Sequence, residues 1–426
     1  MAKDLQSLPG FRDFRPEDCA VRNYLFQTFR AVAHRYGFSE YETPVLEPTE
    51  LYAKKAGGEL NSQLFRFEDQ GKRDVTLRPE VTASLARLAG GLSLPRDYPL
   101  PLRWFEIGQC FRYERPQKGR GREFYQFNVD IIGEPSAAAD AELIALSIDL
   151  MLDLGFQAGD FKVRLSDRNY WTGFAAAQGL DKDQAAELLQ IVDKLEREKP
   201  DVSAEKLTTL GLTLDQVQKA ITQPENLSPD LQSMIEDLKA RGMDDFLEVD
   251  LSIVRGLAYY TGVVFELFDT SKNLRAIAGG GRYDTLFSAM TNGKNDQPAC
   301  GFAIGDMVVR LLVEETPHAN EKLQNWLSSN QPCDVYLVLA DEEKRPEALR
   351  LLAELRRQGH SLQAPLRSAK IQKQFKAAQQ SGAKYALTIG SEFPQLNLKN
   401  LAAREELTFP DPQALKDHLR EVLPRI

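Results

Sequence analysis

The spacing of apolar residues in the first third of the chain predicts one helix followed by a long run of strands. Residues 16–36 place apolar side chains at helical intervals, and Asp13 or a neighbouring residue could cap this helix. From about residue 38 to residue 132, short apolar and β-branched runs alternate with turns, most clearly in TLRP, LRWFEIGQCF and FYQFNVDIIG. Residues 137–154 again predict a helix.

A change in composition marks the middle of the chain. Between about residues 170 and 241 the sequence is rich in leucine, alanine, lysine, glutamate and glutamine and poor in aromatic residues, which predicts a helical insertion. β-Branched and aromatic residues with glycine turns return at 246–266 and 275–287. A further helix is expected after Gly305. The insertion therefore interrupts one β-rich unit, which we expect over residues 1–325.

The pattern restarts after a predicted linker at residues 321–332. CDVYLVLA and KYALTIG predict buried strands, and a Leu-rich helix and the basic helix SAKIQKQFKAAQQSG lie between them. Alternating strands and helices predict a separate α/β domain over residues 331–426, which carries 15 Lys and Arg against 12 Asp and Glu. Its basic residues form either a solvated helix face or a surface for a polyanion: Arg356, Arg357, Arg367, Lys370, Lys373 and Lys376.

Composition and charge bear on the number of domains, the cellular compartment and the binding partners of the protein. The 426 residues suffice for two or three domains, and they include no apolar run of the length that a membrane span needs. The first residues, MAKDLQSLPG, lack the features of a secretory signal or a transit peptide. Four well-separated cysteines without a CxxC pair argue against a disulfide framework or a zinc site and favour a reducing cytoplasm. The net charge of −9 means that a polyanion would have to meet a local basic surface.

Positive charge is concentrated in RYERPQKGRGREFYQF, residues 112–127. Strand alternation is expected to put Arg112 and Glu114 on the same face, because side chains alternate along a strand. Arg112 could grip a phosphate, Glu114 could accept from an amino group, and Phe124 could stack on a flat base. Glycines between the two halves predict a hairpin turn. These groups together suit ATP, and the alternative is a solvated basic hairpin tip.

Two further stretches suit an amino acid and an anion. In TLRPEVT, Glu80 offers a carboxylate to an ammonium group and Thr82 offers a hydroxyl, although a salt-bridged strand end is an equal alternative. In VRGLAYYTG, Arg255 lies among apolar residues and glycines, and a buried guanidinium is costly unless it meets an anion. Tyr259 and Tyr260 would point to opposite faces of a strand, so that one lines a pocket while the other packs.

Other motifs of catalysis are weak or missing. The run AGGGRYD allows a close approach of the backbone to a ligand, and it equally suits a bulge or a tight turn. No stretch matches GxxxxGK[ST], and no dinucleotide fingerprint precedes a helix. The four histidines lie in helical or linker contexts, which argues against a hydrolytic triad.

The order of these stretches resembles a known family. RYERPQKGRGREFYQF is similar to motif 2 of class II aminoacyl-tRNA synthetases, and Pro44 stands at the position of the motif 1 proline. TLRPE, VRGLAYYTG and GGGRYD resemble signatures of histidyl-tRNA synthetases. The resemblance runs from about residue 5 to the C-terminus. It implies an α+β catalytic domain with an antiparallel sheet (the class II synthetase fold), a helical insertion at about 170–241 and a C-terminal α/β anticodon-binding domain.

The resemblance also implies a reaction and its partners. The carboxylate of L-histidine would attack the α-phosphate of ATP and release pyrophosphate. The 3′-terminal hydroxyl of tRNA(His) would then take the histidyl group. ATP with Mg²⁺, L-histidine and tRNA(His) are the expected ligands, without an organic cofactor or a resident metal site. Motif 1 implies a homodimer, and the expected location is the cytoplasm, away from a membrane.

Matching residues are assigned the family's roles one by one. Arg112 would hold the α-phosphate, Glu114 the adenine amino group and Phe124 the adenine ring. Arg255 would stabilise the charge that develops at the α-phosphate. The remaining assignments are Arg120 and Arg122 for the outer phosphates; Glu80, Thr82 and Gln126 for the amino end of histidine; Asp130, Tyr259 and Tyr260 for its side chain; and Gln117, Lys118, Arg367, Lys370 and Lys373 for tRNA.

Several positions depart from the family pattern. Ala258 stands where many members have an aspartate, and Asp130 replaces a glutamate with a carboxylate that is one methylene shorter. In motif 3 the family's Gly-Leu-Glu-Arg reads GDMV, so the ATP-clamping arginine falls on Val308. Arg310 lies two residues further, about 200° around a helix, and cannot simply substitute. The candidates for the missing phosphate contact are Arg120 and Arg282.

The main alternative is a catalytically silent paralogue, like the regulatory subunit of ATP phosphoribosyltransferase. That subunit shares the histidine-binding fold but typically lacks the anticodon-binding domain. Residues 331–426 and the intact Arg112 and Arg255 argue against this alternative. A basic RNA-binding protein without catalysis would leave Glu80 and Arg255 unexplained.

Overall fold

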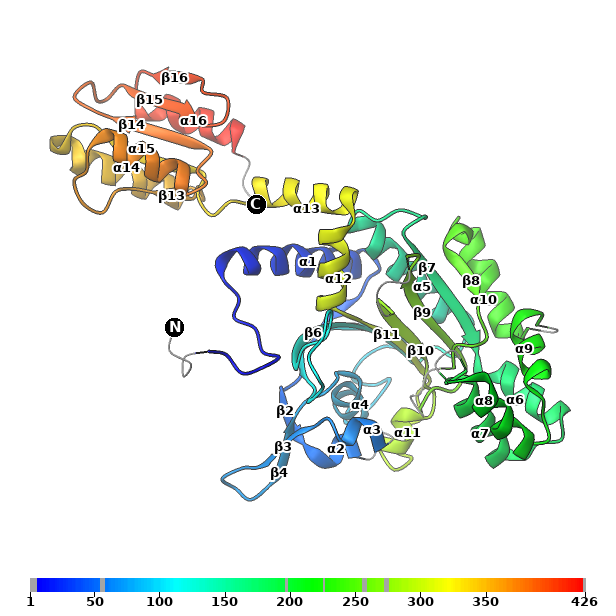
Figure 1. Cartoon of the computed structure of the whole chain (residues 1–426). Helices are drawn as coiled ribbons and strands as arrows, with labels where there is room; N and C mark the ends of the chain where they lie inside the picture. Colours follow the sequence, from blue (N-terminus) through cyan, green and yellow to red (C-terminus); the bar gives the residue numbers. More distant parts are fainter. Residues whose placement is uncertain are drawn as a thin grey trace. The chain divides into compact units, whose positions relative to one another are not determined.

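The computed structural model describes residues 6–53, 58–195, 198–224, 227–254, 259–271 and 276–423 (Figure 1). The chain divides into two compact units, Met1–Gln324 and Asn325–Ile426. Arg255, to which the sequence assigns a role at the α-phosphate, and Ala258, which departs from the family pattern, lie outside the described residues.

An eight-stranded sheet forms the centre of the first unit. Its order is β1-β5-β6-β11-β10-β9-β7-β8, and its five inner pairings, from β5 to β7, are antiparallel. The edge pairs β1–β5 and β7–β8 are parallel. The strands are β1 (Ser39–Glu40), β5 (Leu102–Phe111), β6 (Glu123–Ile132), β7 (Phe161–Asp167), β8 (Leu247–Val249), β9 (Val263–Asp269), β10 (Ala278–Arg282) and β11 (Ala299–Gly305).

Helices α1 (Pro16–Arg35), α5 (Ala137–Asp153) and α12 (Asp306–Glu315) pack on one face of this sheet (Figure 1). The ring of Phe29 in α1 stacks on Phe127 in β6, with 4.9 Å between the ring centroids. The helices predicted at 16–36, at 137–154 and after Gly305 are therefore confirmed, although the N-cap of α1 is Arg15 rather than Asp13.

The opposite face of the sheet is partly covered by α4 (Thr82–Gly90), which follows a small three-stranded sheet. Leu85 of α4 lies in one buried cluster with Ile132 of β6 and Val264 of β9. The small sheet has the order β2-β4-β3, with β2 (Leu46–Pro48), β3 (Phe65–Glu68) and β4 (Asp74–Leu77). Short helices α2 (Thr49–Ala53), α3 (Gly58–Asn61) and α11 (Leu286–Met290) complete this region.

Five helices occupy the stretch between β7 and β8. They are α6 (Arg168–Ala177), α7 (Lys182–Val192), α8 (Pro200–Thr209), α9 (Leu214–Thr222) and α10 (Pro229–Ala240), and the 3₁₀ helix η2 (Asp244–Phe246) follows. Several begin with side-chain caps, as in α7, where Asp181 accepts from the N–H groups of Asp183 and Gln184. Among the described residues, no helix is both long and apolar enough to span a membrane.

The second unit is built on a mixed five-stranded sheet of order β13-β12-β14-β15-β16. Leucines of both layers form its core, including Leu337 of β12 and Leu415 of α16. The elements are β12 (Val335–Leu339), η3 (Glu342–Lys344), α14 (Arg345–Arg357), β13 (Leu362–Gln363), α15 (Ile371–Gln380), β14 (Tyr385–Ile389), β15 (Leu396–Asn400), β16 (Glu406–Phe409) and α16 (Pro412–Val422). The pattern had not predicted β15 and β16.

The linker predicted at 321–332 contains the division between the two units, but it is helical for most of its length. Helix α13 (Pro317–Ser329) occupies it, and the division between the two units falls within this helix. Ala319 and Leu323, one helical turn apart, are buried. The polar residues between them lie on the outer faces of the helix, and this high polar content hid the helix in the sequence.

Candidate active site

The candidate site lies on the sheet face opposite α1. Side chains alternate along β6, so Phe127 points toward α1 while Phe124, Gln126 and Asp130 point the other way. The alternation thereby brings three predicted residues, which lie two and four positions apart, onto one surface.

Glycines of the neighbouring strands flank these side chains. Gln126 pairs with Gly108 of β5 and Gly305 of β11, and Asp130 pairs with Gly301 of β11. A Cβ atom on Gly301 would lie 2.0 Å from Asp130 Oδ1. Any larger residue there would displace the carboxylate, whereas glycine leaves room beside it.

Asp130 is a buried carboxylate that a hydroxyl group orients. Its exposed fraction is 1%, and the Tyr283 hydroxyl donates to Oδ1. Burial and the charge of Asp130 raise the pKa of Tyr283, so this hydroxyl stays a donor. The ring of Tyr259 meets that of Tyr283 edge-on, with 5.9 Å between the ring centroids. The centroid of the Tyr260 ring lies 4.8 Å from that of Tyr259, with 47° between the ring planes. The structure thus brings Asp130, Tyr259 and Tyr260 together, and it adds Tyr283.

Arg112 connects three separate segments of the site. Its guanidinium lies 5.2 Å from the ring centroid of Phe124. Its Nε donates to the carbonyl of Pro79 at 2.9 Å, directly before the buried Glu80. Thr82 begins α4, two residues further on. The groups predicted for phosphate, base and ammonium therefore converge from β6, from the end of β5 and from the start of α4.

The prediction that Arg112 and Glu114 share a strand face is wrong, because β5 ends one residue before Arg112. The Arg112 N–H donates to the Arg122 carbonyl at 2.9 Å, and the Glu114 N–H turns back onto the Arg112 carbonyl at 2.8 Å. Pro116 follows without an N–H group, so the ladder does not resume there. A tight turn, rather than strand alternation, sets the position of Glu114.

Two predicted phosphate-binding arginines contact the loop between β5 and β6. Arg120 lies 2.7 Å from the Glu114 carboxylate. Arg122 donates from Nε to the Glu114 carbonyl at 3.2 Å, and its guanidinium stacks on Tyr113 at 4.0 Å. A nucleotide that uses both Arg120 and Glu114 would have to separate this ion pair.

The tip of the loop carries two of the residues predicted to meet tRNA. Backbone hydrogen bonds of 2.8 and 3.1 Å between Gln117 and Arg120 close a turn, with Gly119 in the left-handed region at φ +72°. Lys118 pairs with Glu315 at 2.8 Å, and both side chains are more than half exposed. An exposed ion pair of this kind is weak and easily exchanged for another anion.

Arg282 belongs to a buried ion network instead of an open phosphate site. Its exposed fraction is 7%. Nε and Nη2 donate to Asp140 at 3.0 and 2.5 Å, and Nη1 donates to the Glu134 carbonyl at 3.1 Å and to Asp284 at 3.2 Å. Because every guanidinium nitrogen has a protein acceptor, the geometry favours a structural link between β10 and α5 over a contact with ATP.

The residues at and just after GDMV, the altered motif 3 sequence, have contacts elsewhere in the first unit. Asp306 is buried, its Oδ1 accepts from the Tyr125 N–H at 2.8 Å, and its Oδ2 binds Arg12 at 2.9 Å. Val308 packs beneath the hairpin tip, 3.4 Å from a Cβ built on Gly119. Arg310 pairs with Asp18 of α1 at 2.9 Å. Arg310 is therefore held away from the site, as the helical geometry led us to expect.

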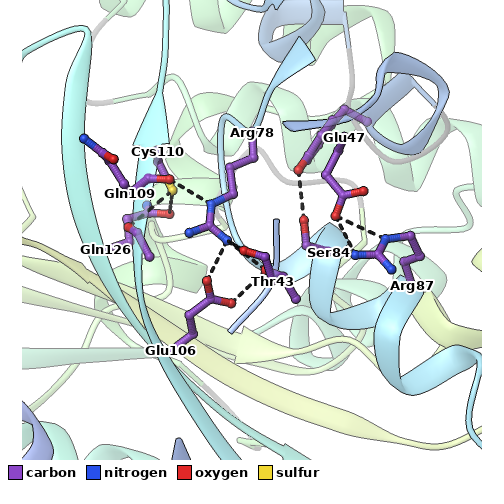
Figure 2. Close-up of polar contacts among 11 residues, drawn as sticks. Thr43, Glu47, Arg78, Ser84, Arg87, Glu106, Gln109, Cys110 and Gln126 are labelled. Carbon is purple, nitrogen blue, oxygen red and sulfur yellow. Dashed lines mark hydrogen bonds and ion pairs between the residues drawn. The ribbon is translucent and has the colours of Figure 1, made fainter. Parts of the chain in front are cut away.

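A buried polar network lies on the same sheet face as Asp130 (Figure 2). It makes the end of β4 a salt-bridged strand end, the alternative left open for TLRPEVT, although its partner was not predicted. Arg78 donates to Glu106 at 2.6 Å, to the Thr43 hydroxyl at 2.8 Å and to the Gln109 carbonyl at 2.8 Å. The Thr43 hydroxyl donates in turn to Glu106 at 2.8 Å. Both side chains of the ion pair are at most 3% exposed. The network ties three segments to one another beside Gly108, where an added Cβ would lie 2.7 Å from Arg78 Nη2.

Burial and the hydrogen-bonding partners of Glu106 shift its pKa in opposite directions. Burial raises the pKa of Glu106, whereas Arg78 and Thr43 lower it. An unpaired buried charge is costly, so the carboxylate and the guanidinium depend on one another. Figure 2 also shows a second ion pair, in which the buried Glu47 binds the partly exposed Arg87 of α4 at 2.7 Å.

Comparison with known proteins places this geometry in a family. Residues 10–307 match the family model described as histidyl-tRNA synthetase, and residues 334–416 match the model of an anticodon binding domain. The chain belongs to the histidyl-tRNA synthetase family. The histidine–tRNA ligase of Opitutus terrae is 41% identical to it over 432 residues, which cover 96% of this chain and 96% of that protein. Members of this family are ligases that use ATP as a substrate.

Solved structures agree in fold. The histidyl-tRNA synthetase of Nostoc sp. PCC 7120 superposes with a TM-score of 0.76 at 23% identity, over 98% of this chain and 99% of that one. A Bacillus halodurans protein described as an ATP phosphoribosyltransferase regulatory subunit/histidyl-tRNA synthetase gives 0.72 at 23% identity, over 91% and 98%. Identities this low show the fold alone. The predicted family, the fold class and the function of a histidine–tRNA ligase are confirmed, and the regulatory-subunit alternative has no better support.

In this synthetase, α6 holds the segment around the predicted Tyr259–Tyr260 pair. Arg168 donates from Nη1 to the Tyr260 carbonyl at 2.8 Å, and its Nε and Nη2 lie 3.4 Å from the Val254 carbonyl. The Trp171 indole donates to the Leu251 carbonyl at 2.8 Å. Sequence analysis missed both residues, because their targets are backbone carbonyls that leave no motif.

The predicted tRNA-binding residues of the second unit surround the start of α15. Lys370 is the N-cap residue, and Arg367 and Lys373 are exposed on either side of it. Gln374 is buried and fastens this helix to β12: it donates to the Leu339 carbonyl at 2.9 Å and accepts from the Leu339 N–H at 2.7 Å. A fixed helix start therefore presents three cations in the unit that matches the anticodon-binding model of this synthetase family.

Within the described ranges, no group of three or more His, Cys, Asp and Glu side chains could hold a metal ion. All four cysteines are free, and Cys110 is buried beside Gln126, with its Sγ 3.5 Å from Gln126 Oε1. Burial raises the pKa of Cys110 to about 12, so this thiol is not a nucleophile at neutral pH.

Proposed function

We propose that histidine is activated on the β5–β6 face of the first unit, between Asp130 and Arg112. The observation that carries this proposal is the oriented carboxylate of Asp130 on a glycine-flanked surface, with Arg112 and Phe124 further along the same hairpin. A buried carboxylate suits the N–H of an imidazole ring. A guanidinium near an aromatic face suits a nucleoside phosphate.

The proposed roles follow the order of these groups. Asp130, with Tyr259 and Tyr260, holds the imidazole ring of histidine, and Glu80, Thr82 and Gln126 hold its ammonium group. Phe124 stacks on adenine, Glu114 accepts from its amino group, and Arg112 binds the α-phosphate. Arg120 and Arg122 reach the outer phosphates, with Mg²⁺ bound to ATP. Arg255, outside the described residues, supplies the further positive charge at the α-phosphate.

Chemistry then requires two transfers. A carboxylate oxygen of histidine attacks the α-phosphorus of ATP, and the bond to the bridging oxygen breaks to release pyrophosphate. The 3′-terminal hydroxyl of tRNA(His) attacks the carbonyl carbon of the adenylate, and AMP leaves. The protein contributes position and positive charge, because both transition states carry negative charge on oxygen.

We further propose how the parts of the chain divide this work. The first unit is the catalytic domain, and its five inserted helices lie within it at about 170–241. The second unit reads tRNA(His) through Arg367, Lys370 and Lys373, while Gln117 and Lys118 meet the acceptor end. A homodimer in the cytoplasm completes the proposal, supported by the position of Pro44 and by the cysteine pattern.

The experiment is histidine-dependent exchange of labelled pyrophosphate into ATP, measured on the Arg112→Ala variant. Loss of one charge-stabilising donor lowers the exchange rate by about 10²-fold or more. Arg115, exposed three residues away, provides the matched control: Arg115→Ala removes the same charge and leaves the rate nearly unchanged. Equal rates for the two variants would exclude Arg112 from the site.

A further inference from the structure

The first residues of β6 are held by the N-terminal segment and by the start of α12. β11 pairs with residues 126–132 of β6, so the first three residues of β6 lie beyond the end of β11. There the Glu123 N–H donates to the Gly10 carbonyl at 3.3 Å, and the Tyr125 N–H donates to Asp306 Oδ1 at 2.8 Å. These two bonds take the place of the sheet ladder on that edge of β6.

Arg12 connects the same edge to α12. Its Nη2 donates to Asp306 Oδ2 at 2.9 Å and to the Glu123 carbonyl at 3.5 Å. Asp306 is the first residue of α12, and its side chain is 4% exposed. One buried carboxylate therefore binds the Arg12 guanidinium through Oδ2 and the β6 backbone through Oδ1. Leucine, which stands at this position in Gly-Leu-Glu-Arg, could accept neither bond.

Aromatic residues fix the segment that carries Arg12, residues 10–14, which we call the N-terminal strap. Phe11 packs edge-on against Phe65, with 5.8 Å between the ring centroids. On the other side of Arg12, the ring centroid of Phe14 lies 4.8 Å from the guanidinium. The strap is thus held on both sides of Arg12, and the ion pair completes its attachment to the sheet.

We propose that Arg12 is a positioning residue for the activation step: through Asp306 it holds the end of β6 that presents Phe124 to adenine. This inference rests on the proposed function, in which Phe124 stacks on adenine. Both neighbours of Phe124 along the strand are held, one by the Gly10 carbonyl and one by Asp306. A ring that is already fixed loses less entropy when the nucleotide binds, so the ion pair favours ATP binding.

The contacts of Arg12 suit support of the strand rather than contact with the nucleotide. Its Nε is buried, and its Nη2 is bound to Asp306. Burial raises the pKa of the Asp306 carboxyl, whereas Arg12 and the Tyr125 N–H lower it. The carboxylate therefore depends on the guanidinium to keep its charge, and both bonds of Asp306 weaken when Arg12 is removed.

The first test compares Arg12→Met with the unaltered chain in histidine-dependent pyrophosphate exchange. Methionine keeps an unbranched chain and removes the ion pair. The KM for ATP rises about tenfold, the lower scale of one hydrogen bond to a charged group, while the KM for histidine stays nearly unchanged. Arg22→Met is the matched control, since Arg22 also lies over Phe14, at 5.1 Å, but does not bind Asp306, and it leaves both constants unchanged.

The second test removes both charges, because Arg12→Met alone leaves a buried carboxylate without its cation. Asp306→Asn can still accept from the Tyr125 N–H but cannot form the ion pair. In the double variant Arg12→Met with Asp306→Asn, the KM for ATP stays about tenfold raised. This variant also decides the question if the single variant does not fold. A return of the KM to its original value would show that the unpaired charge, and not loss of the ion pair, caused the first effect.

The third test asks whether Arg12 acts through Phe124. In a chain that carries Phe124→Ala, the stacking ring is already lost, so the addition of Arg12→Met raises the KM for ATP little further. A merely structural role of Arg12 would be independent of Phe124, and the second substitution would then raise the KM by about another tenfold. That result would overturn the inference.

The outcomes separate the two proposals. Exchange by the unaltered chain with an unchanged KM for ATP in Arg12→Met overturns this inference alone. Equal rises of the KM for ATP and of the KM for histidine in that variant also overturn it, because they show a general disturbance of the site. Absence of histidine-dependent exchange in the unaltered chain overturns the proposed function and this inference together.

Discussion

At the scale of single residues, the absence of a side chain at Gly301 leaves room for the Asp130 carboxylate. Gly301 faces the carboxylate across the β6–β11 pairing, and the Tyr283 hydroxyl fixes one of its oxygens. A glycine contributes here through close approach rather than through an unusual backbone angle. The carboxylate can keep its orientation only while that position carries no side chain.

We therefore expect Gly301→Ala to damage histidine binding selectively. The added Cβ would lie 2.0 Å from Asp130 Oδ1, so the carboxylate must move. The KM for histidine in pyrophosphate exchange rises by about 10- to 100-fold, the scale of one hydrogen bond to a charged group. Gly159→Ala is the control, because a Cβ there meets no atom within 4 Å. An unchanged KM in Gly301→Ala would show that Asp130 does not contact histidine.

Single residues also mark where sequence reasoning reached its limit. Glu80, Gln126 and Asp130 could be chosen from the sequence, since the resemblance to the family assigns each of them a role. The pairing of Arg78 with Glu106 could not, because it joins segments that only the folded sheet brings together.

At the scale of elements, the hairpin β5–β6 and helix α6 approach the candidate site from different directions. The hairpin carries Arg112, Phe124 and Asp130 directly. Helix α6 acts through backbone carbonyls, with Arg168 binding those of Val254 and Tyr260. Since α6 is the first of the five inserted helices, the insertion is joined to the segment that carries Tyr259.

Arg168 is accordingly a positioning residue, and Arg168→Gln tests this role. A glutamine cannot span two carbonyls from one planar group as a guanidinium does, so the tyrosine pair loses its support. The KM for histidine rises about tenfold, while the KM for ATP changes little. Thr172→Ala, one turn further along α6, serves as the control. A parallel rise of both constants would indicate a general loss of structure instead.

The elements that sequence analysis missed have identifiable signals. Leu396 and Leu398 are buried and alternate with polar residues, which is the period of a strand, but β15 and β16 are only five and four residues long. The helical character of the linker, α13, was missed because most of its residues are polar. β5 ends at Phe111, and Pro116, five residues further on, prevents the ladder from resuming. The aromatic residues before that proline hid the break.

At the scale of the whole molecule, charge and chemistry are divided between two units. Residues 1–330 carry 38 Lys and Arg against 50 Asp and Glu, whereas residues 331–426 carry 15 against 12. An acidic first unit gives little general attraction to tRNA, so contacts must come from local cations. The two family models fall on the same two parts of the chain, at 10–307 and at 334–416.

The central claim is that this chain activates histidine with ATP and passes it to tRNA(His). The most direct measurement is pyrophosphate exchange into ATP with each of the twenty amino acids in turn, followed by charging of tRNA(His) with labelled histidine. The account predicts exchange with histidine far above every other amino acid, and charging of that tRNA. Absence of exchange with histidine, or equal exchange with unrelated amino acids, would contradict it.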